Sequence, residues 1–379
     1  MPGVERHQAD LIVVGLGAMG AAVAWRAVTR GLKVIGIDAR RPPHTAGSTH
    51  GRSRIIREAY FEHPQYVPLV QRAYELWAEL EHTRRMRLFQ ATGGLMIGHP
   101  ESSVVAGTLQ AAREHGLHVQ TWTREEIRRN VPVLVPGDGM VGVFEPRAGV
   151  LAPERAVSAM LDGASAGADL QLETPVTGWE QAGNRVVVRS GDAVFEAPKM
   201  VLAAGAFLPA LSGEPAWPLT VERQVQFWFS TGGDARFAPG RLPVFLVEMA
   251  DGRMLYGLPD QGHGVKLAEH HGGTPTTAEG VNREVAVAER DRFAAFASPW
   301  IDGLPTTPSE SAVCLYTNTP DGDFVLDRHP AADRAYVVSA CSGHGFKFAP
   351  AIGDVVVSEL LGEPTAFDLT PFRLSRFPV

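Results

Sequence analysis

Apolar residues in the first forty positions form two short continuous runs that flank an amphipathic stretch. Leu11–Val14 and Val34–Asp38 carry apolar side chains almost without a break, which is typical of strands buried on both faces. Between them, Ala21–Thr29 is rich in alanine and valine and predicts a helix. The order strand, helix, strand indicates a βαβ unit with a parallel sheet.

The rest of the chain continues this alternation of helical and extended patterns. Apolar spacing predicts further helices over Tyr66–Glu81, Val104–His115, Arg124–Asn130, Pro153–Ala166, Val285–Phe296 and Ala349–Leu361. Apolar runs predict strands over Thr92–Gly98, Met140–Phe144, Leu170–Leu172, Val186–Arg189, Val194–Ala197, Lys199–Gly205 and Ala335–Ala340. Two longer extended segments, Leu219–Ser230 and Val244–Leu258, carry a turn signal at Asp251-Gly252 and predict an antiparallel sheet.

Strands suited to one parallel sheet occur near the start, in the middle and near the end of the chain. Lys199–Gly205 is a candidate third strand beside the βαβ unit, and Ala335–Ala340 is followed by a glycine-containing turn and a helix. We therefore predict an α/β fold with a discontinuous, Rossmann-like FAD-binding domain formed by residues 1–90, 150–215 and 320–379. Residues 91–149 and 216–319 are expected to form a second, antiparallel-sheet-containing substrate domain.

A glycine pattern at the first strand end indicates a dinucleotide site. Gly15 permits the tight turn, Gly17 lets the backbone approach a pyrophosphate, and Gly20 lets the helix pack close to the strand. The helix N-terminus that follows attracts the anion. Asp38 ends the second strand, where its carboxylate can accept a hydrogen bond from a ribose hydroxyl and disfavours the 2′-phosphate of NADP. FAD and NAD therefore remain as candidate cofactors, and the discontinuous domain favours FAD.

Composition and charge narrow the choice of partners. The formal net charge is −7 and no basic tract occurs, so nucleic acid and anionic membranes are not expected as partners. Two cysteines give neither a disulfide framework nor a metal cluster, so we predict no metal site. The N-terminus lacks the apolar core of a signal peptide, and the glycines interrupt the first apolar stretch; a cytoplasmic location is the default expectation.

Several longer motifs resemble the monomeric sarcosine oxidase and N-methyltryptophan oxidase family of FAD-dependent amine oxidases. They occur at Asp10–Gly20, Pro42–Arg57 (P-P-H-T-A-G-S-T-H-G-R-S-R-I-I-R), Ala312–Thr317 (A-V-C-L-Y-T) and Ser342–Phe348 (S-G-H-G-F-K-F). The C-terminal run F-D-L-T-P-F-R-L-S-R-F is similar to the N-methyltryptophan branch. The resemblance implies a monomer that oxidises a secondary amino acid with FAD and O2, giving demethylated amino acid, formaldehyde and H2O2.

Other activities stay open at this point. A cyclic substrate such as proline or pipecolate would give a cyclic imine instead of formaldehyde. A dehydrogenase of the same fold would pass the electrons to a carrier rather than to O2. An NAD-linked enzyme and a catalytically idle flavoprotein are the remaining alternatives.

Cys314 in the A-V-C-L-Y-T motif matches the family cysteine that attaches covalently to the flavin. A thiolate can add to the electron-poor flavin, and a neighbouring positive charge favours the thiolate. A lone cysteine is more commonly an inert core residue, so the prediction rests on the motif. Cys341 is read as part of an apolar strand and is expected to be inert.

The segment around residue 50 concentrates positive charge. Arg52, Arg54 and Arg57 would repel one another unless an anion lies between them, and arginine grips carboxylates with two parallel hydrogen bonds. By resemblance, Arg57 binds the substrate carboxylate, Arg54 and His50 lie near the flavin ring, and the neighbouring Ser48 belongs to the cofactor site. Arg52 is a departure, because relatives usually carry Asp there. The change reverses a charge near the site entrance and puts the substrate preference in doubt.

Two lysines are expected at the flavin. Lys347 follows Gly343 and Gly345, two glycines that let backbone N–H groups approach a ligand. The helix that starts just after them would stabilise negative charge on the flavin. In relatives this lysine also helps to hold the substrate carboxylate. Lys266 matches the lysine that promotes electron transfer to O2, where a cation lowers the cost of superoxide.

Further pocket residues follow only from the resemblance. Tyr256, His270 and Tyr316 match residues that line the amine cavity, although buried aromatic core positions would look the same. Val176 is expected to offer backbone contacts to the adenine.

Overall fold

The computed structural model describes residues 6–211, 213 and 217–377, and a mainly parallel sheet organises one end of this part of the chain. Its strand order is β10-β3-β2-β14-β22-β21, and every pairing except β21 with β22 is parallel. The strands are β2 (Leu11–Val14), β3 (Val34–Ile37), β10 (Ala168–Gln171), β14 (Met200–Leu202), β21 (Val325–His329) and β22 (Ala332–Ser339). They come from four separate stretches of sequence, so the Rossmann-like unit is discontinuous, as predicted.

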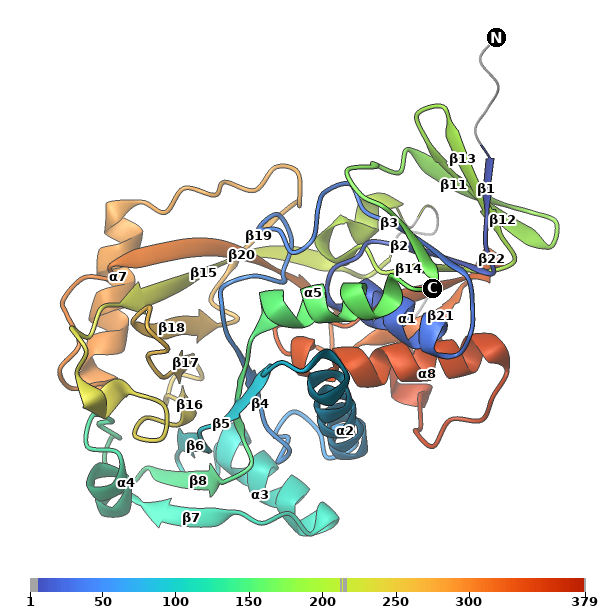
Figure 1. Cartoon of the computed structure of the whole chain (residues 1–379). Helices are drawn as coiled ribbons and strands as arrows, with labels where there is room; N and C mark the ends of the chain where they lie inside the picture. Colours follow the sequence, from blue (N-terminus) through green and yellow to red (C-terminus); the bar gives the residue numbers. More distant parts are fainter. Residues whose placement is uncertain (1–5, 212, 214–216, 378–379) are drawn as a thin grey trace.

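Helices cover one face of this sheet and a second sheet covers the other (Figure 1). Alternate residues divide between the faces: Leu11 and Val13 pack on the helices, and Ile12 and Val14 pack toward the second sheet. The helices are α1 (Ala18–Thr29), α2 (Tyr66–Arg84), α5 (Pro153–Ala164) and α8 (Ala349–Leu361). The second sheet has the order β1-β13-β12-β11, with β1 (Arg6–Gln8), β11 (Gly178–Ala182), β12 (Arg185–Ser190) and β13 (Ala193–Ala197).

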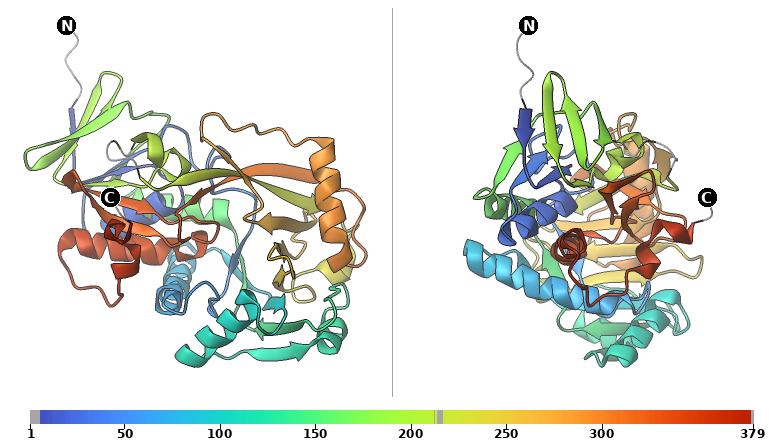
Figure 2. Two further views of the ribbon diagram at one scale, coloured as in Figure 1. Left: turned by 180° about the vertical axis from the view of Figure 1, so that it is seen from behind. Right: turned by 90° about the vertical axis from the view of Figure 1, so that its right-hand side faces the viewer.

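A large, mainly antiparallel sheet forms the other end of the molecule (Figure 2). Its strands are β6 (Gly94–Gly98), β7 (Gln120–Thr123), β8 (Val141–Glu145), β15 (Thr220–Phe229), β16 (Val244–Glu248), β17 (Met254–Leu258), β18 (Val265–His270), β19 (Thr274–Thr276) and β20 (Glu310–Asn318). Helices α3 (Ser103–His115), α4 (Arg124–Asn130) and α7 (Val287–Ala297) flank it, and α6 (Leu208–Leu211) is a single turn. A small sheet, β4 (Arg54–Ile56), β9 (Gly149–Leu151) and β5 (Phe89–Ala91), lies between the two ends.

The predicted fold class is confirmed, and most predicted elements occur with shifted ends. Helix α1 begins at Ala18 rather than Ala21, because Gly17 already serves as the helix cap. Val244–Leu258 is a hairpin of β16 and β17 that turns through Asp251 and Gly252, as the turn signal indicated. Cys341 is not part of a strand, since β22 ends at Ser339. The boundaries proposed for the two domains stay a prediction.

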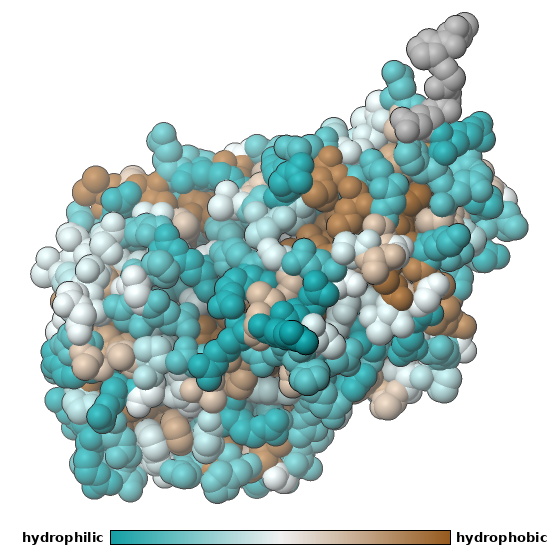
Figure 3. Space-filling model, in the orientation of Figure 1, coloured by the Kyte–Doolittle hydropathy of each residue, from teal (hydrophilic) through white to brown (hydrophobic). Residues whose placement is uncertain are grey.

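Within the described residues, no helix combines the length and the apolar character needed to cross a bilayer. On the face drawn in Figure 3, hydrophilic residues predominate and hydrophobic areas are scattered among them. Among the large apolar side chains of the described part, Val287 and Leu361 are the exposed ones.

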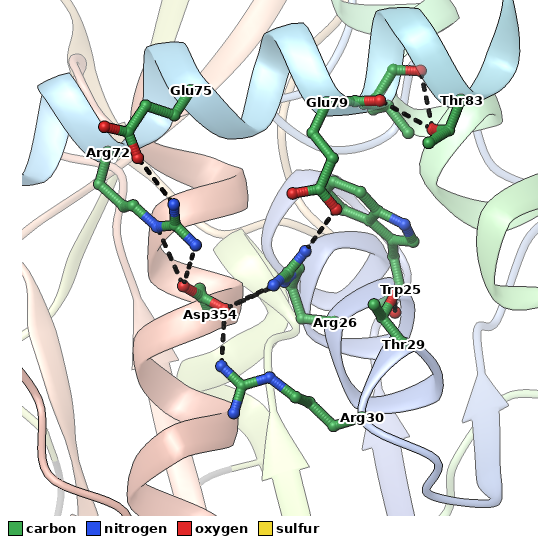
Figure 4. A network of polar contacts seen from close by, with 10 residues as sticks. Trp25, Arg26, Thr29, Arg30, Arg72, Glu75, Glu79, Thr83 and Asp354 are labelled. Atoms are coloured by element: carbon green, nitrogen blue, oxygen red, sulfur yellow. Dashed lines mark hydrogen bonds and ion pairs between the residues drawn. The ribbon is translucent and has the colours of Figure 1, made fainter.

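A buried carboxylate joins the three helices beneath the parallel sheet (Figure 4). Asp354 of α8 accepts hydrogen bonds from Arg26 and Arg30 of α1 and from Arg72 of α2, with N–O distances of 2.9 to 3.2 Å. Burial alone would raise the pKa of Asp354, but the charges of Arg26 and Arg72 outweigh it and lower the pKa. This carboxylate therefore ties α8 to α2 and to the C-terminal end of α1.

Replacing Asp354 by asparagine is expected to lower the free energy of unfolding by about 3 kcal/mol, because buried Arg26 loses its buried carboxylate partner and keeps only the exposed Glu79. Urea or thermal denaturation measures the change. Glu363→Gln is the matched control: it removes another partner of Arg30 at an exposed site, and should cost less than about 1 kcal/mol. Equal losses in the two variants would contradict the special role of Asp354.

Candidate active site

A cavity of about 600 Å³ runs between the parallel sheet and the large antiparallel sheet. Most residues predicted to form the site line it: Gly15, Gly17, Asp38, Ser48, Arg54, Arg57, Val176, Tyr256, Lys266, His270, Cys314, Tyr316, Gly343, Gly345 and Lys347. Gly20 and His50 do not line it. The cavity thus joins segments that lie up to three hundred residues apart in the sequence, from the turn after β2 to the turn before α8.

The glycine turn after β2 has the geometry that its pattern predicted. Gly15 has φ +88° and lies so close to Ala203 that a Cβ would meet its carbonyl oxygen at 2.6 Å. A Cβ on Gly20 would lie 1.7 Å from the Gly15 oxygen, so Gly20 permits close helix packing rather than ligand contact. Asp38 accepts hydrogen bonds from Leu16 N and Arg40 N, both at 2.8 Å, while lining the cavity. The carboxylate is thereby held at the cavity end where a ribose would lie.

The second glycine turn precedes α8 and corrects one part of the prediction. Gly345 does not present its N–H to a ligand, because this N–H donates to Cys341 O at 3.0 Å. A Cβ at Gly345 would lie 1.8 Å from Ala340 O, so glycine is needed for the tight turn itself. Gly343 has φ +76° and packs against Tyr316 and His270, which places its backbone at the cavity wall.

Cys314 lies on β20 with its thiol at the cavity and beside a fixed positive charge. Arg54 Nη2 is 3.9 Å from Cys314 Sγ and donates to Ser48 O at 2.7 Å. Arg54 Nη1 donates to Ser53 O at 2.9 Å, so the guanidinium cannot swing away from the sulfur. Cys341 also reaches the cavity, but its sulfur accepts a hydrogen bond from Thr317 N, and burial raises the pKa of its thiol. Of the two cysteines, Cys314 is therefore the better placed to react.

Arg57 meets a carboxylate that the sequence pattern did not indicate. Its Nη2 donates to Glu62 Oε1 at 2.7 Å and to Oε2 at 2.5 Å, and its guanidinium lies 4.3 Å from the rings of Tyr60 and Phe61. Burial alone would raise the pKa of Glu62, but the charge of Arg57 outweighs it and lowers this pKa to about 2. Glu62 also lines the cavity, so its carboxylate pairs with Arg57 from within the site.

The arginines of this segment do not share one anion, contrary to the expectation. Arg57 pairs with Glu62 and Arg54 with backbone carbonyls. Arg52 turns away from the cavity and pairs with Glu310 through two hydrogen bonds of 2.8 and 2.7 Å. Arg52 therefore directs its charge to Glu310 and not into the cavity, because local partners satisfy each guanidinium separately.

His50 lies behind the cavity wall instead of on it. Its side chain is buried, and its Nε2 atom has no hydrogen-bond partner among the described residues. Burial, reinforced by the charges of Arg54 and Lys266, lowers the pKa of His50 to about 4. A neutral histidine at this place can support Arg54 and Lys266 without adding a third positive charge.

Lys347 is fixed near Arg57 by a chain of hydrogen bonds. Its Nζ donates to His344 O at 2.7 Å and to Tyr60 Oη at 3.3 Å, and Tyr60 Oη lies 2.5 Å from His344 Nδ1. Burial lowers the pKa of Lys347 to about 7; the charge of Arg57 lowers it too, whereas Glu62 opposes the shift. Two cationic side chains thus converge on one end of the cavity, with one internal carboxylate between them.

Lys266 on β18 also lines the cavity, and among the described residues it has no carboxylate within ion-pair distance. Its Nζ donates to the backbone oxygens of Gly51 at 3.0 Å and Ser53 at 2.9 Å, above the ring of Trp228. Burial, together with the charge of Arg54, lowers the pKa of Lys266 well below its ordinary value. The ammonium group is therefore held rigidly and is poorly compensated, which suits a site where negative charge develops.

Tyr256, His270 and Tyr316 form the wall between the two lysines. Tyr316 Oη lies 3.4 Å from His270 Nδ1, and the Tyr256 ring meets His270 edge-on. Burial raises the pKa of Tyr256 to about 12 and lowers that of His270 well below its ordinary value. These three side chains are uncharged and carry both polar and apolar atoms. They can therefore face a neutral amine without competing for the carboxylate of the substrate. Val176 lines the far end of the cavity, beside Pro175 and Thr177.

The lining residues fit a flavin dinucleotide on structural grounds. Ser48 Oγ, Gln226 Oε1 and Ser339 Oγ are buried at the cavity without hydrogen-bond partners among the described residues. Such orphaned polar atoms indicate that a further group completes the site. The cavity also extends from the glycine turn and Asp38 to Lys266 and Lys347, which matches a dinucleotide with its ring at the lysines.

Sequence reasoning missed Glu62, Tyr60 and His344. Glu62 is separated from Arg57 by a loop, and no helical or strand periodicity relates the two positions. The usable signal was the excess of arginines over acids in Pro42–Arg57, since a buried guanidinium needs a carboxylate nearby. His344 lies inside the S-G-H-G-F-K motif, but the motif alone does not reveal its bond to Tyr60.

Comparison with known proteins agrees with this geometry. Residues 10–359 match the family described as "FAD dependent oxidoreductase". The chain is 39% identical to a monomeric sarcosine oxidase of Streptomyces avermitilis over 97% of this chain and 98% of that protein. It is 36% identical to an N-methyl-L-tryptophan oxidase of Salmonella heidelberg over 97% and 99% of the two chains.

Solved structures share the fold at lower sequence identity. NikD, described as an unusual amino acid oxidase of nikkomycin biosynthesis, aligns with a TM-score of 0.84 and 21% identity over 97% of each chain. An L-proline dehydrogenase from P. horikoshii aligns with a TM-score of 0.84 and 20% identity over 98% of each chain. Together with the sequence matches and the cavity, these findings show that the chain belongs to the FAD-dependent oxidoreductase family that includes monomeric sarcosine oxidase and N-methyl-L-tryptophan oxidase.

Proposed function

We propose that this protein is an oxidase of N-methyl amino acids of the sarcosine or N-methyltryptophan type. Oxidation would give an imine, with O2 reduced to H2O2, and water would hydrolyse the imine to the demethylated amino acid and formaldehyde. The observation that carries the proposal is the convergence of Arg57 and Lys347 at one end of a cavity that a flavin fits. The names of the sarcosine and N-methyltryptophan oxidases, which are 39% and 36% identical, support the same substrate class.

The protein residues divide the work of binding the substrate. Arg57 and Lys347 bind the carboxylate, and Glu62 leaves Arg57 when the substrate arrives, so that one carboxylate replaces another. The neutral wall of Tyr256, His270 and Tyr316 receives the amine in its uncharged form. FAD supplies a two-electron acceptor for the C–H bond next to the nitrogen. No side chain has to act as a strong base, because an amine that binds uncharged has its nitrogen lone pair free and carries no additional ammonium proton to remove.

Other residues that line the cavity would hold the cofactor. Gly15, Gly17 and Asp38 would hold the pyrophosphate and the ribose, and Val176 would contact the adenine. Ser48, Gly343 and Gly345 would border the ring, with Cys314 as the attachment point. Lys266 would stabilise the negative charge that forms when O2 is reduced, with Arg54 and His50 adjacent. We further propose a monomer, as in the name of the Streptomyces relative.

A peroxide-coupled screen tests the substrate class directly. Sarcosine, N-methyl-L-tryptophan, L-proline and pipecolate are offered to the purified protein, and formaldehyde is measured alongside H2O2. The proposal expects peroxide and formaldehyde in equal amounts from an N-methyl substrate. Peroxide from proline or pipecolate alone would favour the cyclic-amine alternative. Anaerobic bleaching of the flavin without peroxide in air would indicate a dehydrogenase that uses another acceptor.

The pH dependence of carboxylate binding provides a second test. A bound carboxylate needs the charged form of Lys347, whose pKa of about 7 lies far below that of free lysine. Affinity for acetate should therefore be full below about pH 7 and should fall by up to about tenfold per pH unit above it, until the pKa of the complex is reached. Perturbation of the flavin spectrum measures the dissociation constant. Lys347→Met should bind more weakly and without this inflection; an unchanged inflection would assign it to another group.

A further inference from the structure

We propose that Glu154 is a positioning residue for Lys266: its carboxylate holds the turn Gly51–Ser53, whose carbonyl oxygens in turn hold the lysine ammonium. The functional consequence rests on the role proposed above for Lys266 in the reaction with O2. Glu154 itself does not line the cavity, so it acts through the turn and not on the substrate.

The turn has a backbone conformation that requires an external partner. Gly51 has φ +102° and Arg52 has φ +68°, so two consecutive residues adopt the left-handed region. Their N–H groups point to the same atom, Glu154 Oε1, at 2.7 and 2.9 Å. Consecutive N–H groups in such a conformation form a concave anion site, and a charged acceptor strengthens both hydrogen bonds. The carboxylate therefore sets the conformation that a non-glycine residue at position 52 would otherwise avoid.

Lys266 depends on the opposite side of the same turn. Its Nζ donates to Gly51 O and Ser53 O, and its side chain is 2% exposed. An ammonium has three donors, so one N–H is left to face the cavity. If the turn relaxes, the two carbonyl oxygens move and this remaining N–H loses its direction. The direction of the cation is thus set by the peptide units that Glu154 fixes.

The turn makes a second contact, the ion pair between Arg52 and Glu310, which is weaker than the contact with Glu154 and provides an internal comparison. Arg52 pairs with Glu310 and lies over Trp228, and Glu310, Trp228 and Lys266 form one row across β20, β15 and β18. The side chains of Arg52 and Glu310 are 39% and 47% exposed, and ion pairs at such positions contribute little. Glu154 instead lies in the first turn of α5, which packs on α1. It therefore couples Lys266 to the helix layer of the parallel sheet.

The test uses the flavin-loaded protein and separates the two halves of the reaction. The flavin is reduced with dithionite under anaerobic conditions, mixed with oxygenated buffer, and its reoxidation is followed by absorbance. Reduction by the amine is measured separately without O2. Hydrogen–deuterium exchange of the peptide around Gly51 reports the turn without any turnover. The variants are Glu154→Ala, Glu154→Gln, Lys266→Met, the double variant Glu154→Ala/Lys266→Met, and Glu310→Ala as the exposed control.

We expect Glu154→Ala to slow reoxidation about tenfold and to speed amide exchange in the turn, while reduction by the amine changes less than about twofold. Glu154→Gln keeps an Oε1 acceptor and should stay within about threefold of the wild type, and Glu310→Ala within about twofold. The Glu154→Ala change should add nothing in the Lys266→Met background, because both changes act on one group.

Several outcomes would overturn the proposal. One is wild-type reoxidation in Glu154→Ala with the flavin retained, and another is an equal slowing of both half-reactions. Equal losses in the alanine and glutamine variants would assign the effect to charge instead of position. Additive losses in the double variant would remove Lys266 from the pathway. Because dithionite replaces the amine, failure of the substrate proposal would appear only in the reduction arm and would leave the reoxidation result readable.

Discussion

Replacing Cys314 by alanine is expected to release the flavin from the polypeptide on acid precipitation, whereas the wild-type protein keeps its yellow colour in the pellet. The thiol of Cys314 faces the cavity, where the flavin ring would lie, with the Arg54 guanidinium 3.9 Å away. The expected change is from full retention to none, because the proposed tether is a single bond to Cys314. Mass spectrometry of the denatured chain measures it as the presence or absence of one added FAD.

The matched control is Cys341→Ala, because Cys341 lies at the same cavity. Its sulfur accepts a hydrogen bond from Thr317 N, and burial raises the pKa of its thiol, so it is not expected to react. The control should keep the flavin attached. Release from the Cys341 variant, or retention by the Cys314 variant, would contradict the assignment. A wild-type protein that binds FAD but releases it on precipitation would show that FAD binding needs no tether here.

The fold was predictable from the sequence wherever a short stretch of residues specifies its own local structure. The buried runs Leu11–Val14 and Val34–Ile37, the glycine turn and Asp38 determine a dinucleotide fold without reference to distant residues. The third strand, Met200–Leu202, was recognisable because a buried parallel strand reads as an uninterrupted apolar run. These features depend on short-range chemistry, which a sequence displays directly.

The site was only partly predictable, because its partners are distant or lie in loops. The motif suggested that Arg57 binds a carboxylate. Glu62, whose carboxylate pairs with Arg57 in the structure, lies in an irregular loop. Arg52 looked like a charge at the site entrance, yet Glu310, two hundred and fifty-eight positions away, draws it outward. Glu154 acts on two backbone N–H groups, and contacts of that kind leave no side-chain pattern to read. Long-range pairing therefore decides which of several similar arginines faces the cavity.

Replacing Arg57 by alanine is expected to raise the KM for an N-methyl amino acid by about 10²- to 10³-fold, since a buried, two-pronged carboxylate pair contributes roughly 3 to 4 kcal/mol. The rate at saturating substrate should change less, because the role proposed for Arg57 is to hold the carboxylate and not the reacting C–H bond. Steady-state kinetics with sarcosine measures both. Sarcosinamide, which lacks the charge, should be oxidised by the variant about as well as by the wild type; an unchanged KM for sarcosine would refute the role of Arg57.

Glu62→Gln is the informative partner of this variant, because it acts on the same guanidinium with the opposite sign. In the proposed binding step, the substrate carboxylate displaces Glu62, whose pKa is lowered to about 2 by its pairing with Arg57. Removing that charge leaves Arg57 buried and uncompensated, so the ligand-free protein should lose stability. The substrate carboxylate then supplies the missing charge, and the KM should fall by about three- to tenfold. A higher KM in this variant would mean that Glu62 orients Arg57 for the substrate instead of competing with it.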